Sequence, residues 1–233
     1  MIRIARLYHR WLMLFVGIQF FVWSFSGLYM VMLNIHYIHG EDYLVSGQSV
    51  LPVDAVSYDI NALLARFPHA NSIRLGWLHD MVIYRFKLAG KDIMIDASSG
   101  HIIPSIDQDL AEQIASGYLH KSLPFSETKL ITKSPPSEIG SRNLPLWQVE
   151  FEGLNSLTLY ISPLSGELIS TRHNAWRGFD LLWRLHIMDY TEGEDINNIL
   201  LNVFTISGVL ALLAGILLLY LRLFKNNCVD ASA

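Results

Sequence analysis

Four of the nine histidines in this sequence lie near the ends of two long uncharged blocks. His9 precedes the first block, His36 and His39 follow it, and His186 lies shortly before the second. An imidazole ring ligates metal ions and haem iron, and it exchanges protons near neutral pH. We therefore expect these four histidines to be the candidate ligands, and the helices that carry them determine which of them can meet.

The two uncharged blocks run from Trp11 to Leu33 and from Ile196 to Leu221. A helix needs roughly 20 apolar residues to cross about 30 Å of hydrocarbon, so each block is long enough to span a membrane. The first block is also longer than the roughly 7–15 apolar residues of a cleavable signal peptide, and no small-x-small cleavage site follows it. We therefore expect two uncleaved membrane spans.

The basic residues predict the orientation of these spans. Arg3, Arg6 and Arg10 precede the first span, and Arg222 and Lys225 follow the second. The flanks on the loop side are acidic instead. By the positive-inside rule both termini are cytoplasmic, and the large loop is translocated. We expect a bacterial inner-membrane protein whose main domain is periplasmic.

Composition limits what the loop can be. The only cysteine is Cys228, in the predicted cytoplasmic tail, so the loop must be held by its core rather than by a disulfide. The formal net charge is −4 and the loop has no basic patch, which excludes nucleic acid as an expected partner. The spacings of the remaining histidines favour no zinc site.

The loop contains an internal repeat. The segment Ile93–Ile103 corresponds to Leu159–Ile169, and in both a strand ends in a turn that contains a glycine. We expect a positive φ at Gly100 and Gly166. Asp96 is expected to cap the first of these turns.

Each copy of the repeat is expected to be a helix followed by a three-stranded antiparallel meander. For the first copy the predicted helix is Tyr58–Arg66 and the strands are Ser72–Leu78, Met81–Leu88 and Asp92–Asp96. For the second copy they are a helix at Asp107–Leu119 and strands at Thr128–Thr132, Leu146–Phe151 and Leu157–Ser162. The stretch Ser134–Gly140 is an irregular insertion within the second copy.

An amphipathic helix is expected between the repeats and the second span. Apolar and aromatic residues recur there every three or four positions: Trp176, Phe179, Trp183, Ile187 and Tyr190. The segment is too short and too charged to cross a membrane, so we expect it to lie in the outer interface.

The fold class that follows is membrane α+β, with two transmembrane helices flanking a periplasmic domain of two tandem repeats. The predicted segments are a cytoplasmic N-terminus at 1–10, spans at 11–34 and 196–221, repeats at 50–104 and 105–171, an interfacial helix at 172–190 and a cytoplasmic tail at 222–233.

Several short motifs resemble the PepSY-associated transmembrane (PepSY-TM) family. The first span opens on His9-Arg10-Trp11 and carries Ser26-Gly27-Leu28 in its outer half. The turn that ends at Gly100 is similar to the turn that closes a PepSY module. Leu185-His186 before the last span, and Ser207-Gly208 inside it, resemble the closing segment of that family.

The resemblance implies PepSY-like repeats and leaves three functions open. Larger members are haem-b proteins that reduce iron–siderophore complexes, but they commonly have four spans where this chain has two. Soluble PepSY modules inhibit proteases as propeptides, and other members have no assigned role. We favour an accessory or partner-binding subunit of a membrane complex, without enzyme activity of its own. The alternatives are a haem-b redox subunit of an iron or siderophore reductase-type system and a tethered protease regulator.

The candidate haem ligands are His186, His36, His39 and His9. Among them we favour His186 first and His36 second. A b-type haem needs axial histidines near the membrane that face into a helix bundle. His36 or His39 lies at a similar expected depth to His186, whereas His9 would need a partner chain. No catalytic residue and no other metal ligand is predicted. The expected partners are the lipid bilayer and either other membrane-protein subunits or further copies of this chain.

Overall fold

The structure is a computed structural model, and it describes residues 2–45, 50–139, 144–153, 155–191 and 193–230. The chain divides into two compact units. The helical unit comprises Met1–Leu33 and Gly178–Ala233, and the α+β unit comprises Asn34–Arg177.

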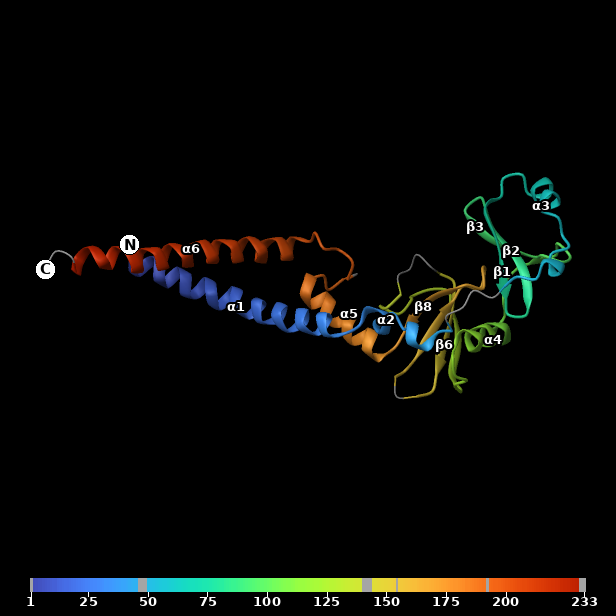
Figure 1. Ribbon diagram of the computed structural model, residues 1–233, viewed down its shortest axis with the longest axis horizontal. Helices are drawn as coiled ribbons and strands as arrows, with labels where there is room; N and C mark the ends of the chain where they lie inside the picture. The colour runs from blue at the N-terminus through green and yellow to red at the C-terminus, as the bar shows by residue number, and fades with distance from the viewer. Residues whose placement is uncertain (1, 46–49, 140–143, 154, 192, 231–233) are drawn as a thin grey trace. The chain divides into compact units, whose positions relative to one another are not determined.

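Two long helices form most of the helical unit. α1 spans Ile2–Met32 and α6 spans Ile199–Asp230, and they pack along each other (Figure 1). The rings of Phe15 and Phe204 stack with centroids 4.7 Å apart. Val16 is buried, and its Cγ1 would lie 3.8 Å from a Cβ placed at Gly208, so the absence of a side chain on α6 lets the helices approach closely.

These helices cover most of the predicted spans 11–34 and 196–221 and extend beyond them toward the chain ends, but α1 ends at Met32 and α6 begins only at Ile199. The apolar segments long enough to cross a membrane are His9–Met32 and Ile199–Leu223. The predicted N-terminus 1–10 is already helical from Ile2, and the predicted tail continues α6 to Asp230. Residues 231–233 of that tail lie outside the described residues.

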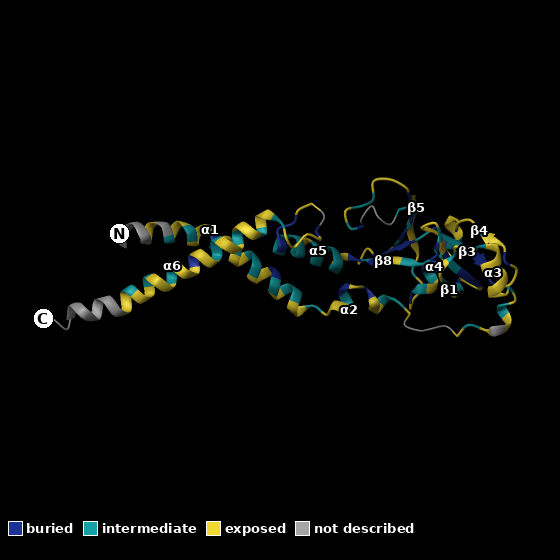
Figure 2. Ribbon diagram, turned by 90° about the horizontal axis from the view of Figure 1, so that it is seen from above, coloured by how far each residue is buried: buried dark blue, intermediate teal, exposed yellow. Residues whose placement is uncertain are grey.

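Both helices carry many exposed apolar side chains, interspersed with half-buried ones (Figure 2). Only 17% of the apolar window of α1 and 6% of that of α6 is buried inside the protein. The core helix of a soluble protein would be mostly buried. The large exposed side chains therefore need an apolar environment that this chain does not itself provide.

The α+β unit contains the repeat that the sequence predicts. In the first copy, α3 (Ile60–Arg66) precedes β1 (Asn71–Leu78), β2 (Met81–Leu88), β3 (Lys91–Asp96) and β4 (Ile102–Ile103). In the second, α4 (Gln108–Tyr118) precedes β5 (Phe125–Ile131), β6 (Leu146–Phe151), β7 (Thr158–Ile161) and β8 (Leu168–Arg172). Each group of strands is an antiparallel meander in chain order.

The expected three strands of each copy are therefore present, and a fourth strand completes each sheet. β4 has only two residues, too few for an alternating pattern to be recognised in the sequence. The predicted turn geometry is confirmed, because φ is +73° at Gly100 and +64° at Gly166. The carboxylate of Asp96 accepts a hydrogen bond from the backbone N of Ser98 at 2.7 Å, as expected of a turn cap.

The two sheets share one hydrophobic core. Side chains alternate between the two faces of β2, so Val82, Tyr84 and Phe86 lie on one face. There they pack with Leu63 of α3. The opposite face of this sheet contributes Leu78, Ile83 and Met94 to a core with α4 and the second sheet. The residues that join this core from α4 and the second sheet include Ala111, Ile114, Ala115, Val149, Phe151, Leu159 and Ile161. One repeat alone would leave this face uncovered.

The closing turn of the second copy docks against the first sheet. The Arg85 side chain donates from Nε to the carbonyl of Ser165 at 2.6 Å and from an Nη to the carbonyl of Trp77 at 2.7 Å. Burial lowers the pKa of this guanidinium. A Cβ at Gly166 would overlap Cδ1 of Leu78, so glycine is required there by both φ and space.

The segment that enters the α+β unit is short and irregular. It contains α2 (Ile35–Ile38) and a 3₁₀ turn at Glu41–Tyr43, and a second 3₁₀ turn follows at Val53–Ala55. Leu44 pairs with Leu119 in an isolated bridge, and Val45 N donates to the carbonyl of Tyr118 at 2.8 Å. The segment is thereby joined to the end of α4.

A helix is also present where the interfacial helix was predicted. α5 spans Asn174–Ile187, within the predicted range 172–190. Its first turn belongs to the α+β unit, and the part from Gly178 onward belongs to the helical unit.

Candidate functional site at the contact of α1 and α5

His186, the first predicted ligand, lies near the end of α5 and contacts α1. Its Nδ1 is 2.8 Å from Oγ of Ser26, whose side chain is fully buried. The indole Nε1 of Trp23 donates to the backbone carbonyl of His186 at 2.7 Å. Trp23 and Ser26 are three residues apart on a helix, so they contact α5 from the same face.

The hydrogen bonds of Ser26 determine which nitrogen of His186 carries the proton. Oγ of Ser26 is 2.7 Å from the carbonyl of Val22, and a hydroxyl at that distance from a carbonyl must donate to it. The same oxygen can then only accept from His186, so Nδ1 carries the hydrogen. Nε2 consequently presents its lone pair.

That lone pair is available. In the part of the chain that the structure describes, Nε2 of His186 has no hydrogen-bond partner, and it is not among the fully enclosed polar atoms. Metal-ligating histidines commonly present one nitrogen in this way while the other donates to a nearby oxygen. The arrangement fits one axial ligand of a haem.

Hydrogen bonds of the segment that follows α5 hold the end of the helix that carries His186. The Asp189 carboxylate accepts hydrogen bonds from the Thr191 hydroxyl at 2.7 Å and from the backbone N of Asp195 at 3.0 Å. These bonds hold the pKa of Asp189 well below its usual range.

The side chain of Asn198, which caps α6, also contacts the end of α5. It donates to the carbonyl of Ile187 at 2.8 Å. Trp183 Nε1 also donates to the carbonyl of Gly193 at 3.0 Å.

The other predicted ligands are not brought to His186 within the helical unit. His9 is the only other histidine of that unit, and it lies 17 residues before Ser26 on α1, roughly 25 Å along a helix. Its ring packs against α6, where Cε1 would lie 3.3 Å from a Cβ at Gly215. His9 and His186 therefore cannot ligate one iron in this chain.

His36 and His39 belong to the α+β unit. His36 is exposed, and its Nδ1 lies 2.7 Å from a carboxylate oxygen of Glu41. His39 is also exposed, with Nδ1 3.9 Å from the same carboxylate group. Their pairing with His186 across the two units stays a prediction.

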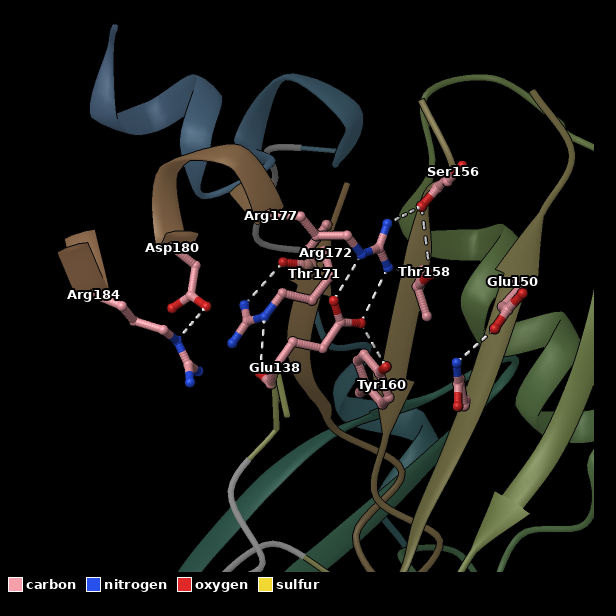
Figure 3. Close-up of polar contacts among 11 residues, drawn as sticks. Glu138, Glu150, Ser156, Thr158, Tyr160, Thr171, Arg172, Arg177, Asp180 and Arg184 are labelled. Carbon is pink, nitrogen blue, oxygen red and sulfur yellow. Dashed lines mark hydrogen bonds and ion pairs between the residues drawn. The ribbon is translucent and has the colours of Figure 1, made fainter. Parts of the chain in front are cut away.

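A second polar cluster lies on the outer face of the second sheet (Figure 3). Glu138 accepts two hydrogen bonds from Arg177, at 2.7 Å from Nε and 3.0 Å from an Nη, and one from the Tyr160 hydroxyl at 2.7 Å. Burial and the neighbouring Glu138 raise the pKa of Tyr160. The predicted insertion Ser134–Gly140, of which Gly140 lies outside the described residues, thus contributes a half-buried carboxylate. The cluster is internally satisfied, which favours a structural role.

Ser26 and Trp23 stand out in the sequence, but nothing in their spacing connects either of them to His186. The signal is a small polar residue, Ser26, three positions after a tryptophan within an apolar helix, and the neighbouring Ser24 shares this character. Across the described ranges, no group of three or more His, Cys, Asp or Glu side chains could hold a metal ion.

Comparisons with known proteins give no further guidance, since no family model, no curated protein and no solved structure matches this chain.

The tautomer of His186 is directly measurable. We predict that ¹⁵N NMR of histidine-labelled, detergent-solubilised protein shows Nδ1 protonated and Nε2 unprotonated at a pH where the ring is neutral. Ser26→Ala removes the oxygen that fixes this state, so the two tautomers should mix.

Ser24→Ala is the matched control, because Ser24 is exposed on the same helix and should leave the spectrum unchanged. A wild-type ring protonated at Nε2 would contradict the assignment.

Proposed function

We propose that this chain is a membrane-anchored accessory or partner-binding subunit of a bacterial inner-membrane complex. The observation that carries the proposal is the exposed apolar surface of α1 and α6. Only 17% of the apolar window of α1 and 6% of that of α6 is buried inside the protein. Helices of this length with so little internal burial suit a lipid environment. The basic residues at both ends of the chain favour cytoplasmic termini and a periplasmic α+β unit.

The α+β unit is the part that would meet a partner. Its two helix-plus-meander repeats support the PepSY-like interpretation of the sequence. Because the repeats share one core, the unit can present its outer surfaces as a rigid body. The acidic flank of the second span, with Glu194 and Asp195 held in a hydrogen-bonded loop, lies on the same predicted side.

The orientation can be tested with the single native cysteine, Cys228. We predict that a membrane-impermeant maleimide labels Cys228 only after spheroplasts are permeabilised. In Cys228→Ser with Lys91→Cys, which places the thiol on an exposed position of the α+β unit, intact spheroplasts should be labelled. The reverse pattern would overturn the proposed topology.

The accessory role predicts a stable companion. We expect that the tagged chain, extracted from native membranes in a mild detergent, copurifies with another membrane polypeptide or elutes as a defined homo-oligomer. An unrelated two-span protein with the same tag controls for detergent-driven association. A monomer without a companion would contradict the proposal.

A second candidate function is a haem-b redox subunit, and the geometry of His186 favours it. When bound, a haem would supply one-electron chemistry. The chain would contribute the Nε2 of His186 as one axial ligand, with Ser26 holding the ring through Nδ1 and Trp23 anchoring the backbone. His36 or His39, or a histidine of another chain, would be needed as the second ligand.

The visible spectrum separates the two candidate functions. If haem is bound, protein purified after haem supplementation should show a Soret band and a sharp α-band on reduction, and His186→Ala should lose both. His69→Ala is the matched control, since His69 is an exposed histidine outside the candidate ligands, and it should keep them. A colourless preparation would exclude the redox candidate for the isolated chain.

A further inference from the structure

His173 is the one histidine that is completely buried in the α+β unit among the described residues. It lies between the end of β8 and the start of α5, where the chain is about to leave the unit. Against it packs Asn34–Tyr43, the segment by which the chain enters the unit. His173 thus lies where the two connections of the unit meet.

The ring holds the incoming segment through one nitrogen. Nε2 of His173 is 3.0 Å from the carbonyl oxygen of Tyr37 and 3.2 Å from that of Ile38. Both oxygens are acceptors, so Nε2 must carry a hydrogen that they share. The rings of Tyr37 and Tyr43 flank the imidazole, each with its centroid 5.3 Å away.

The incoming segment also fits closely against β8. Gly40 has φ +77°, and a Cβ there would lie 2.6 Å from Cγ2 of Thr171. The side-chain amide of Asn155 donates to the Tyr43 hydroxyl at 2.7 Å. These contacts lie beside the hydrogen bonds from His173 to the carbonyls of Tyr37 and Ile38.

The described surroundings of the other ring nitrogen of His173, Nδ1, offer no acceptor for a second proton. Nδ1 is fully enclosed and has no hydrogen-bond partner among the described residues. A proton there would create a buried charge whose new N–H is unpaired.

The carbonyls of Tyr37 and Ile38 would offset that charge only in part, and the other groups around the ring would not. Tyr37 from α2 and Tyr43 from the 3₁₀ turn are phenols, while Arg172 from β8 and Arg177 from α5 are cations. The nearby carboxylate of Glu138 is engaged by Arg177 and Tyr160. Burial, with a smaller contribution from the two arginines, lowers the pKa of His173 below the ordinary histidine value of 6.5.

We propose that His173 is an acid-sensitive latch, which ties Asn34–Tyr43 to the junction of β8 and α5 at neutral pH and releases this segment when the ring is protonated. The latch joins the chain that follows α1 to the chain that leads into α5. Its opening would loosen the α+β unit at its two connections without unfolding either repeat.

The direction of the pH effect follows from the two states of the ring. In the open form the ring is in water and takes up a proton near the ordinary histidine pKa of 6.5. In the closed form it resists protonation to lower pH. As the pH falls below 6.5, the open form binds more protons than the closed form and is therefore favoured. The ratio of open to closed form rises by up to about tenfold for each pH unit, until the closed form also takes up a proton.

Hydrogen exchange on the full chain in detergent tests the latch. We predict that amide protection factors of residues 38–45, corrected for intrinsic exchange, fall at least about tenfold between about pH 7.5 and about pH 5. The protection of β2 and β3 should stay nearly constant. A wild-type segment that stays fully protected at the lower pH would overturn the proposal.

His173→Gln keeps a donor for the two carbonyls but does not titrate in this range, so its segment should show little pH dependence. His69→Gln is the matched control, because His69 is an exposed histidine of the same unit outside the segment and its loss should leave the wild-type response intact. If His173→Gln does not fold, His173→Asn replaces it. An equal pH response in wild type and the folded neutral variant would also overturn the latch.

Discussion

The surface of α1 and α6 imposes the constraint on which the other features depend. Many of the large apolar side chains of these helices are exposed, so the helical unit needs surroundings that are equally apolar. In such surroundings a polar group has no water to bind and must be satisfied internally. Ser26 and Trp23 meet this requirement through His186 and backbone carbonyls, whereas Nε2 of His186 has no partner among the described residues.

The same constraint explains why the α5–α6 connection is so thoroughly hydrogen-bonded. The chain passes from α5 into an apolar helix through the connection 188–198, and the first backbone N–H groups of that helix need acceptors. Asn198 accepts from the N–H of Leu201, and Asp189 accepts from Glu194 and Asp195. The loop therefore both ends α5 and begins α6, and it fixes His186 as a consequence.

The elements of this fold could be predicted from local patterns, but the site could not. Alternation and turn chemistry predict β2 and β6 to the residue and anticipate the positive φ at Gly100 and Gly166. β4 was missed because two residues carry no periodicity. The contact between Ser26 and His186 joins positions 160 residues apart, and no spacing rule connects them. Burial of His173 likewise depends on packing against a segment distant in sequence.

His173 and His186 show how burial separates the roles of one residue type. Each is held by a hydrogen bond at one ring nitrogen, to backbone carbonyls for His173 and to the Ser26 hydroxyl for His186. The second nitrogen of His173 is enclosed beside two arginines, so it can neither reach a ligand nor accept a proton without disrupting its surroundings. The second nitrogen of His186 is not enclosed and presents a lone pair. The first geometry suits a latch that acid opens, and the second suits a ligand whose orientation is already set.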